Sequence, residues 1–494
     1  MRRHPTSLLA VEISAAILFV LLAGGMLWSG DQDGDLVPLD GAALATGPSL
    51  ERWYGFFLQD QHVGYSVTRS SPVSGGGTLF EERSSFRIVT FGKINEVVTA
   101  SAALVDPAGA LLRFDSFMAS GDTRISARAK VEGSHISMEV TQAGETNTVD
   151  FATSAPPQVS LSLEAVLQRT ALTPGLRFTV PYFDPLILKE DQMEIRVDDL
   201  VILENGEEAY WLSTSHGGAT TRALVTPTGE ALREETPLGL SLVRMTPEDA
   251  RDIPTSAEPT DLIGLSAVQL EGRLKGARER HRLTLRIKGV EPSRVWSAPP
   301  LQTITDDIVR IKIPALDELP MLPVRDDSDP QWLVSTLTLP ASHPELRTRA
   351  AEVIGDATDR LTAVRRLVDF VYRYVEKVPT LGVPNGLEVL REARGDCNEH
   401  TALFVSLARA AGIPARIAAG VVWSDRMGNQ PAFYYHAWPE VRLGGPTDWV
   451  PVDPTFGQLP ADATHVKLVE GDLDRQVEIM AVMGRLGFAL VEEP

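Results

Sequence analysis

The segment spanning residues 394–420, RGDCNEHTALFVSLARAAGIPARIAAG, constrains the fold more than any other part of the chain. Apolar residues recur in it at three- and four-residue spacing, which is the period of a helix with one buried face. Gly412 and Pro414 then form a helix stop. We therefore predict a helix over residues 397–411, with Asp396 near its cap and Cys397 in its first turn.

Cys397 is the only cysteine among 494 residues, so the chain can form no disulfide within itself. The first turn of a helix carries unpaired N–H groups and a partial positive charge, and both favour a thiolate over a thiol. The same N–H groups could hold an oxyanion when the sulfur attacks a carbonyl. The alternative is an inert, buried cysteine that packs as a small hydrophobic residue. The neighbouring blocks of sequence bear on this choice.

Two further blocks follow the predicted helix and contain polar residues that suit a thiol nucleophile. Residues 415–423 resemble a strand, and the run AFYYHAWPEVRL places His436 among strand-favouring residues. The run DWVPVDPTFGQ places Asp453 after another short strand at residues 449–452. Neighbouring antiparallel strands could bring His436 beside Asp453 and present both to the end of the helix. A thiolate needs such a base and an orienting group for that base.

The stretches GDCNEHTALFVSLARAAGIPAR, YYHAWPEV and WVPVDPTFGQ together resemble the bacterial transglutaminase-like superfamily, over residues 359–468. The resemblance implies a papain-like core in which Cys397 is the nucleophile, His436 is the general base and acid, and Asp453 orients the histidine. It also implies acyl transfer through a thioester, with a peptide, protein or cell-wall amide as the substrate. Hydrolysis by a peptidase or amidase is slightly preferred over transfer to an amine by a transglutaminase. The alternative is a membrane-anchored binding or assembly protein that recognises chains without cutting them.

Other polar residues in these blocks have simpler interpretations. His400 lies one turn after Cys397 and is a rival base, although a first-turn histidine often contacts only solvent or a nearby acid. Glu399 is interpreted as a first-turn acid that favours the helix dipole. His465 is interpreted as structural, and Trp438 is expected to pack beside the catalytic imidazole.

The sequence argues against metals, cofactors and nucleic acids. Cys397, His400 and His436 could be imagined as zinc ligands, but no CxxC pair supports that reading, and no EF-hand-like loop is present. We therefore predict no cofactor and no metal. The formal net charge of -20 would repel a phosphate backbone, which argues against a nucleic-acid partner. The sequence leaves the oligomeric state open.

The N-terminus contains an apolar run, LLAVEISAAILFVLLAGGMLW, at residues 8–28. The run is long enough to span a bilayer, and it follows Arg2 and Arg3 and precedes Asp31. We predict an uncleaved transmembrane anchor with the bulk of the chain on the extracytoplasmic, periplasmic side. A cleaved signal peptide is the alternative. A lipoprotein is excluded because no cysteine lies near this end of the chain.

The remaining pattern predicts an α+β chain with an N-terminal transmembrane helix, an antiparallel β-rich middle and a C-terminal papain-like domain. Short alternating runs separated by turn signals fill most of the middle, with one helix-like insert around residues 162–170. An amphipathic helical pattern follows Asp359. The predicted domains are an anchor at 1–30, a linker at 31–50, a β-rich domain in one or two halves at 51–250, a second β-rich region with a connector at 251–342, and a transglutaminase-like catalytic domain at 343–494.

Overall fold

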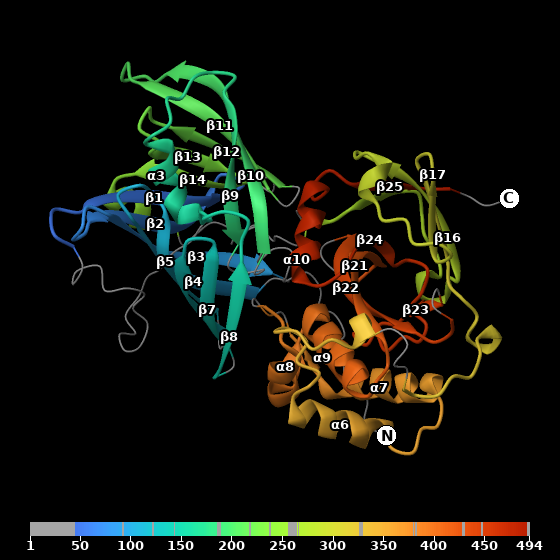
Figure 1. Ribbon diagram of the computed structural model, residues 1–494. Helices are drawn as coiled ribbons and strands as arrows, with labels where there is room; N and C mark the ends of the chain where they lie inside the picture. Colours follow the sequence, from blue (N-terminus) through green and yellow to red (C-terminus); the bar gives the residue numbers. More distant parts are fainter. Residues whose placement is uncertain are drawn as a thin grey trace. The chain divides into compact units, whose positions relative to one another are not determined.

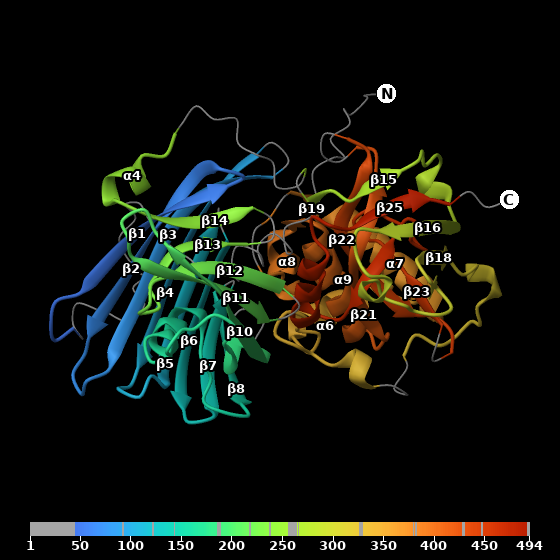
Figure 2. The ribbon, with the colours of Figure 1, turned by 90° about the horizontal axis from the view of Figure 1, so that it is seen from above.

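The computed structural model describes residues 45–491, apart from 91–92, 121–122, 143, 185–188, 217–218, 237–238, 255–263, 265, 326–329, 379, 381–382, 427–429 and 446–447. These residues form two compact units, before and after residue 262, which are described separately. Figures 1 and 2 show the elements of each unit in two views.

The N-terminal unit is built on one fourteen-stranded antiparallel sheet, in the order β8-β7-β6-β5-β4-β3-β2-β1-β14-β13-β12-β11-β10-β9. The first strand, β1, pairs with the last, β14, in the middle of the sheet. Strands β8 and β9, which precede and follow the helical insert, lie at the two edges of the sheet. The strands are β1 Leu50–Leu58, β2 Gln61–Pro72, β3 Thr78–Thr90, β4 Lys93–Val105, β5 Leu111–Ser120, β6 Thr123–Glu132, β7 His135–Gln142, β8 Glu145–Ala152, β9 Arg177–Asp184, β10 Lys189–Ile202, β11 Glu208–His216, β12 Ala219–Val225, β13 Ala231–Glu235 and β14 Leu240–Met245. A short helix, α4 (Pro247–Arg251), follows the last strand.

The alternating sequence pattern explains why this region folds as a sheet with one buried face. In β7, for example, Ile136, Met138 and Val140 are buried while His135 and Glu139 are exposed. The predicted helical insert is present between β8 and β9 as η1 (Ser160–Ser162) and α3 (Leu163–Leu167).

The insert covers part of the sheet and leaves a hollow of about 190 Å³ beside it. Arg52 of β1 is buried under α3 and forms ion pairs with Glu164 of the insert and with Glu230. Two other carboxyl groups that line the hollow, Glu82 and Glu234, have raised pKa values, because burial disfavours their charged forms. The interior of this unit is therefore partly polar.

In the described residues, the C-terminal unit contains two larger sheets, a parallel pair of short strands, β19 and β20, and a group of helices. Its larger sheet has the order β15-β25-β16-β18-β17, and its smaller sheet has the order β23-β22-β21-β24. The strands are β15 Gln269–Glu271, β16 Arg282–Lys288, β17 Gln302–Thr305, β18 Ile308–Lys312, β19 Glu376–Lys377, β20 Arg394–Gly395, β21 Ala415–Ser424, β22 Ala432–Arg442, β23 Trp449–Pro451, β24 Val466–Glu470 and β25 Gly487–Leu490. The helices are η2 Ala277–Glu279, η3 Pro292–Arg294, η4 Leu316–Glu318, η5 Pro330–Leu333, α6 Pro344–Ile354, α7 Arg360–Tyr374, α8 Gly386–Glu392, α9 Cys397–Ala410, α10 Leu473–Gln476 and η6 Val477–Ala481.

Helix α9 is the centre of the core of this unit. It contacts the helices α6, α7 and α8 on one side and strands β21 and β22 on the other. Its residues Leu403, Phe404 and Leu407 are fully buried, as the helical period predicts. The predicted amphipathic helix is α7, which begins after Asp359 because that side chain accepts a hydrogen bond of 2.8 Å from the backbone N–H of Thr362.

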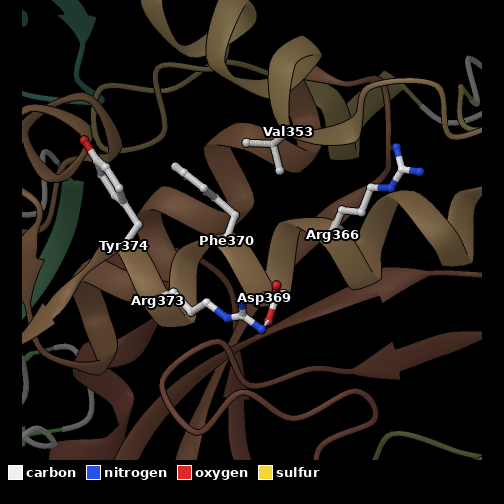
Figure 3. Close-up of a pocket in the computed structure, with 6 residues that line it drawn as sticks. All are labelled: Val353, Arg366, Asp369, Phe370, Arg373 and Tyr374. Carbon is white, nitrogen blue, oxygen red and sulfur yellow. Dashed lines mark ion pairs between the residues drawn. The ribbon is translucent and has the colours of Figure 1, made fainter.

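A shallow hollow of about 500 Å³ lies on the faces of α6 and α7 (Figure 3). Phe370 and Tyr374 stack on each other there, and Arg373 forms an ion pair with Asp369. Neither this hollow nor the one in the N-terminal unit is lined by Cys397.

The structure corrects the predicted fold class and location. Strands account for 48% and helices for 20% of the residues that the structure describes, so this part of the chain is mostly β rather than α+β. The fourteen-stranded sheet contains more residues than the helices around α9. In the part of the chain that the structure describes, no helix is long and apolar enough to cross a membrane. The prediction of a transmembrane anchor, and of a periplasmic location that depended on it, therefore has no support, and its segment, residues 8–28, lies outside the described residues.

Candidate active site

The candidate nucleophile, Cys397, is the first residue of α9, as predicted. Asp396 caps the helix, because its side chain accepts a hydrogen bond of 2.8 Å from the backbone N–H of Asn398. The Asp396 and Glu399 side chains and backbones also form a reciprocal capping box. The N–H groups of Asn398 and Glu399 are therefore used by the cap, so these two first-turn N–H groups are not available to hold an oxyanion.

Glu399 lies in the first turn of α9, as predicted, and takes part in the cap of the helix. It is buried, and its Oε2 atom accepts hydrogen bonds from the Asp396 backbone N–H and the Thr380 hydroxyl. Burial, and then repulsion by the Asp396 carboxylate, hold the pKa of Glu399 well above its ordinary value. The Glu399 carboxyl group therefore completes the cap of α9.

His400 is held by the backbone rather than by the candidate nucleophile. Its Nδ1 atom lies 2.6 Å from the backbone oxygen of Asp396. A carbonyl oxygen can only accept, so Nδ1 carries the proton and donates it. Burial lowers the pKa of His400 to about 4, which keeps the ring neutral.

A hydrogen bond joins the first turns of α9 to the strand that carries the candidate base. The Thr401 hydroxyl donates to the backbone oxygen of Ala437 over 3.1 Å. Thr401 lies one helical turn after Cys397, and Ala437 directly follows His436 in β22. The bond therefore brings the cysteine-bearing face of α9 against the part of β22 that carries His436.

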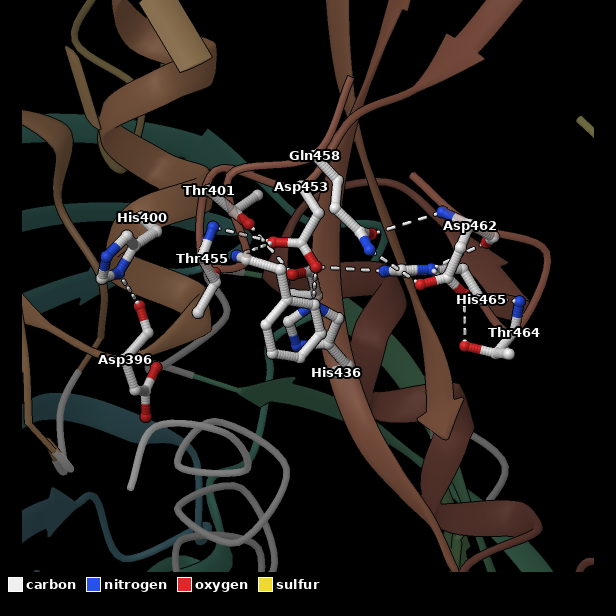
Figure 4. Close-up of polar contacts among 12 residues, drawn as sticks. Asp396, His400, Thr401, His436, Asp453, Thr455, Gln458, Asp462, Thr464 and His465 are labelled. Atoms are coloured by element: carbon white, nitrogen blue, oxygen red, sulfur yellow. Dashed lines mark hydrogen bonds and ion pairs between the residues drawn. The ribbon is translucent and has the colours of Figure 1, made fainter. Parts of the chain in front are cut away.

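His436 and Asp453 form the pair that the sequence predicted. Strands β22 and β23 are antiparallel neighbours, with Glu440 opposite Pro451, and Asp453 lies two residues after the end of β23. The His436 Nε2 atom lies 2.9 Å from Asp453 Oδ2, and both side chains are buried (Figure 4). The other carboxylate oxygen accepts the backbone N–H groups of Thr455 and Phe456, at 2.7 and 2.9 Å. These bonds fix the carboxylate in one orientation.

The electrostatics of the pair keep a charged acid beside a neutral base. Burial alone would raise the pKa of Asp453, but the two imidazoles that donate to it hold its pKa well below its ordinary value. Burial lowers the pKa of His436 and outweighs the opposing effect of the carboxylate. The Nε2–H of His436 therefore donates to Asp453, and Nδ1 is left as the basic nitrogen of the ring.

Aromatic rings hold the His436 imidazole in place. Trp438 stacks near it with ring centroids 6.0 Å apart, which confirms the expected packing, and Phe456 stacks with centroids 5.3 Å apart. Rings packed in this way limit rotation of the imidazole, and a fixed ring is what general acid–base chemistry requires.

A second histidine, which the sequence interpretation treated as structural and did not place, lies at the same carboxylate. His465 Nε2 lies 3.1 Å from Asp453 Oδ2, the oxygen that also accepts from His436. His465 directly precedes β24, which pairs with β21. The only local signal was a histidine three residues after Asp462 and twelve after the candidate orienting acid, at the start of an apolar strand.

Within the described residues, His436, Asp453 and His465 have ligand atoms within 4.8 Å of one another, a spacing that could hold a metal ion. The hydrogen bonds do not favour that reading, because both imidazoles point an Nε2–H at the same oxygen. A metal would have to replace both protons. The donor set therefore fits a proton-mediated site better than a metal centre.

The candidate nucleophile is covered in this conformation. Cys397 has a relative exposure of 1%, and the side chain of His436 is 0% exposed. A substrate carbonyl would have to come within about 3.5 Å of the sulfur before it could be attacked.

One protein-family model matches the part of the chain that contains Cys397, His436 and Asp453. Residues 347–454 match the model of the transglutaminase-like superfamily. No curated protein sequence matches the chain significantly. A candidate cysteine protease from Cytophaga hutchinsonii has a similar structure, with 18% identity over 42% of this chain and 83% of that chain and a TM-score of 0.27. A candidate protease from Parabacteroides distasonis has 12% identity over 69% of each chain and a TM-score of 0.19. A β-barrel-like protein from Brucella abortus, of a domain of unknown function, has 10% identity over 41% of this chain and 97% of that chain and a TM-score of 0.33.

The part of the chain that carries Cys397, His436 and Asp453 is a transglutaminase-like domain, which confirms the predicted resemblance. The match supports a thiol-dependent enzyme of this superfamily in general terms.

Proposed function

We propose that the protein is a thiol-dependent acyl-transfer enzyme that acts on amide bonds of peptides or proteins. The observation that carries the proposal is the buried hydrogen bond between His436 and Asp453. The strand that contains His436 is also hydrogen-bonded, through Thr401, to the helix that begins at Cys397. In this proposal Cys397 is the nucleophile, His436 is the general base and acid, and Asp453 orients His436.

The first half of the reaction forms a thioester. His436 Nδ1 takes the proton of the Cys397 thiol, and the sulfur attacks the amide carbonyl carbon to form a C–S bond. The tetrahedral intermediate then collapses as the C–N bond breaks. The imidazolium of His436 gives its proton to the departing amine. Asp453 stabilises the imidazolium through the Nε2–H bond and keeps Nδ1 directed at the reacting atoms.

The second half releases the acyl group. His436 takes a proton from water, the oxygen attacks the thioester carbon, and the C–S bond breaks to return the sulfur of Cys397. An amine in place of water would give amide transfer instead. Hydrolysis is our preferred outcome, and the whole cycle needs no redox partner.

Labelling of the single cysteine tests the nucleophile. An electrophilic probe should label the wild-type chain, and Cys397→Ser should abolish labelling. Incubation of a peptide library in ¹⁸O-water would then give products carrying one heavy oxygen if water is the acceptor. Labelling that persists in Cys397→Ser would refute the assignment, and amide products without heavy oxygen would identify amine transfer.

The second candidate is a binding protein that uses the transglutaminase-like domain to recognise chains without cutting them. The observation that favours it is the covered sulfur, at 1% exposure. The two candidates differ in turnover. Under the binding hypothesis a peptide would protect Cys397 from labelling and would be recovered intact, whereas under the enzymatic hypothesis it would be recovered cleaved or transferred.

A further inference from the structure

We propose that His465 is a fixed imidazolium that positions Asp453 and makes His436 easier to deprotonate during the reaction. This inference rests on the proposed function, because it concerns which side chains of the same site carry protons. It assigns a role to a residue outside the Cys397, His436 and Asp453 set.

The hydrogen bonds of His465 require a proton on each ring nitrogen. Nδ1 lies 2.9 Å from the backbone oxygen of Asp462, and a carbonyl oxygen can only accept. Nε2 lies 3.1 Å from Asp453 Oδ2, and an ionised carboxylate can also only accept. A neutral imidazole has one N–H, so it could satisfy one of these bonds and not both. Both nitrogens of His465 are therefore donors, and the ring carries a positive charge.

The surroundings of His465 suit a cation. The Asp462 carboxylate lies 3.7 Å from Nδ1, and the Asp453 carboxylate lies on the other side of the ring, at Nε2. Burial would lower the pKa of His465, but its interactions with the Asp453 and Asp462 carboxylates raise it to about 9. The charge therefore persists at neutral pH.

Other charged groups face this cluster and hold it in place. Arg278 of η2 donates to Asp462 Oδ2 over 3.1 Å, and its guanidinium lies 4.2 Å over the Phe456 ring. Gln458 donates to the same Asp462 oxygen over 2.9 Å. The result is a continuous row of groups, from His436 through Asp453 and His465 to Asp462 (Figure 4). Each carboxylate in the row lies beside a cation or an N–H donor.

The consequence for His436 follows from the shared oxygen. Because His465 already neutralises Asp453, the carboxylate stabilises an imidazolium at His436 less than it would alone. The positive ring of His465, whose centroid lies 5.6 Å from that of His436, also repels a second positive charge. The same cation favours a thiolate on the facing helix. His465 is thus a positioning residue that acts through Asp453 and His436 and does not touch the substrate.

The first experiment reads the charge directly and does not depend on activity. The ¹⁵N chemical shifts of the histidine side chains in the full chain at pH 7.5 should show both nitrogens of His465 protonated. They should also show His436 as a neutral ring with its proton on Nε2. A signal from His465 with one unprotonated nitrogen would overturn the proposal, whatever the fate of the proposed enzyme activity.

The second experiment reads the effect on the nucleophile. The rate of iodoacetamide alkylation of Cys397 is measured against pH for the wild type, for His465→Gln and for His281→Gln. The glutamine amide can still donate to Asp453 but carries no charge, and His281 is an exposed histidine of the same unit. We expect the acid limb of the His465→Gln alkylation profile to move to higher pH by about one unit, because the variant lacks the positive charge that favours the thiolate. We expect the His281→Gln profile to match the wild type.

The outcomes separate the two proposals. An acid limb that stays in place in a folded His465→Gln variant, with only a lower rate or a lower stability, would assign His465 a structural role and overturn the inference. If the alkylation rate of wild-type Cys397 did not change with pH, the result would count against the proposed function. The ¹⁵N shifts would still report the protonation state of His465. If His465→Gln does not fold, the wild-type nitrogen shifts decide the question.

Discussion

Replacing Asp453 with asparagine should disrupt both the stability and the reactivity of the site, because no orientation of an amide satisfies the groups around it. One carboxylate oxygen accepts two imidazole N–H groups, and the other accepts two backbone N–H groups. An asparagine must turn its NH₂ group toward one of these pairs. The N–H groups of the asparagine amide would then face two other N–H donors in a fully buried position.

The magnitude follows from the number of broken bonds. Each buried polar group left without a partner costs about 1–3 kcal/mol, so Asp453→Asn should lower the free energy of unfolding by about 2–5 kcal/mol. The effect on reactivity should be larger. If the amide nitrogen faces His436, the ring must take its proton on Nδ1 and lose its base there, which costs roughly 10²–10⁴ in rate.

The assay uses the single cysteine of the chain. Alkylation of Cys397 by iodoacetamide is followed by intact mass over the pH range in which the variant stays folded, and urea unfolding gives the stability. The matched control is Asp359→Asn, at the cap of α7, where asparagine caps a helix as well as aspartate does. An Asp453→Asn variant that is alkylated as fast as the wild type, with the same pH profile, would refute the orienting role of Asp453.

Two further predictions concern buried positions elsewhere in the chain. Burial raises the pKa of Glu234 to about 7, above its value in the unfolded chain, so the stability of the N-terminal unit should fall as pH rises from about 4.5 to 7. Glu234→Gln should therefore stabilise the unit by about 1–3 kcal/mol at pH 8 and change little at pH 4, and equal effects in urea titrations at both pH values would contradict this. A Cβ at Gly420 would lie 2.1 Å from the backbone oxygen of Val466, so Gly420→Ala should cost about 1–3 kcal/mol and slow alkylation of Cys397. Gly487→Ala is the control, because its Cβ would meet ordinary contacts from 3.6 Å; equal losses in both variants would mean that the contact with β24 does not matter.

Local patterns were sufficient to predict the elements that carry the candidate site. The helical period and the cap residue predicted α9 within one residue of its observed end. The strand-favouring run around His436 and the short strand before Asp453 predicted β22 and β23, and the antiparallel pairing between them is observed. These features depend on residues close together in the sequence, where spacing and turn chemistry act directly.

The features that were missed depend on contacts between distant parts of the chain. Strand β25, near the C-terminus, inserts between β15 and β16, which lie about two hundred residues earlier. Nothing in the four residues of β25 specifies that partner. His465 was missed for a related reason. Its position depends on how closely β24 approaches β21 at Gly420, where the register shifts and where only a glycine leaves room for the neighbouring backbone.

The composition of the site is an argument for chemistry over binding. Two histidines and a carboxylate lie in a site where the histidine side chains are at most 1% exposed, and removing charged groups from water costs several kcal/mol for each ion. A recognition surface would gain nothing from these groups, because they are covered and cannot touch a ligand from their present positions. Apolar residues of similar size would stabilise the same core better. This row of buried proton-bearing groups, which begins at His436 on a strand hydrogen-bonded to the helix of Cys397, is costly to fold. Such groups can repay that cost by transferring protons during a reaction.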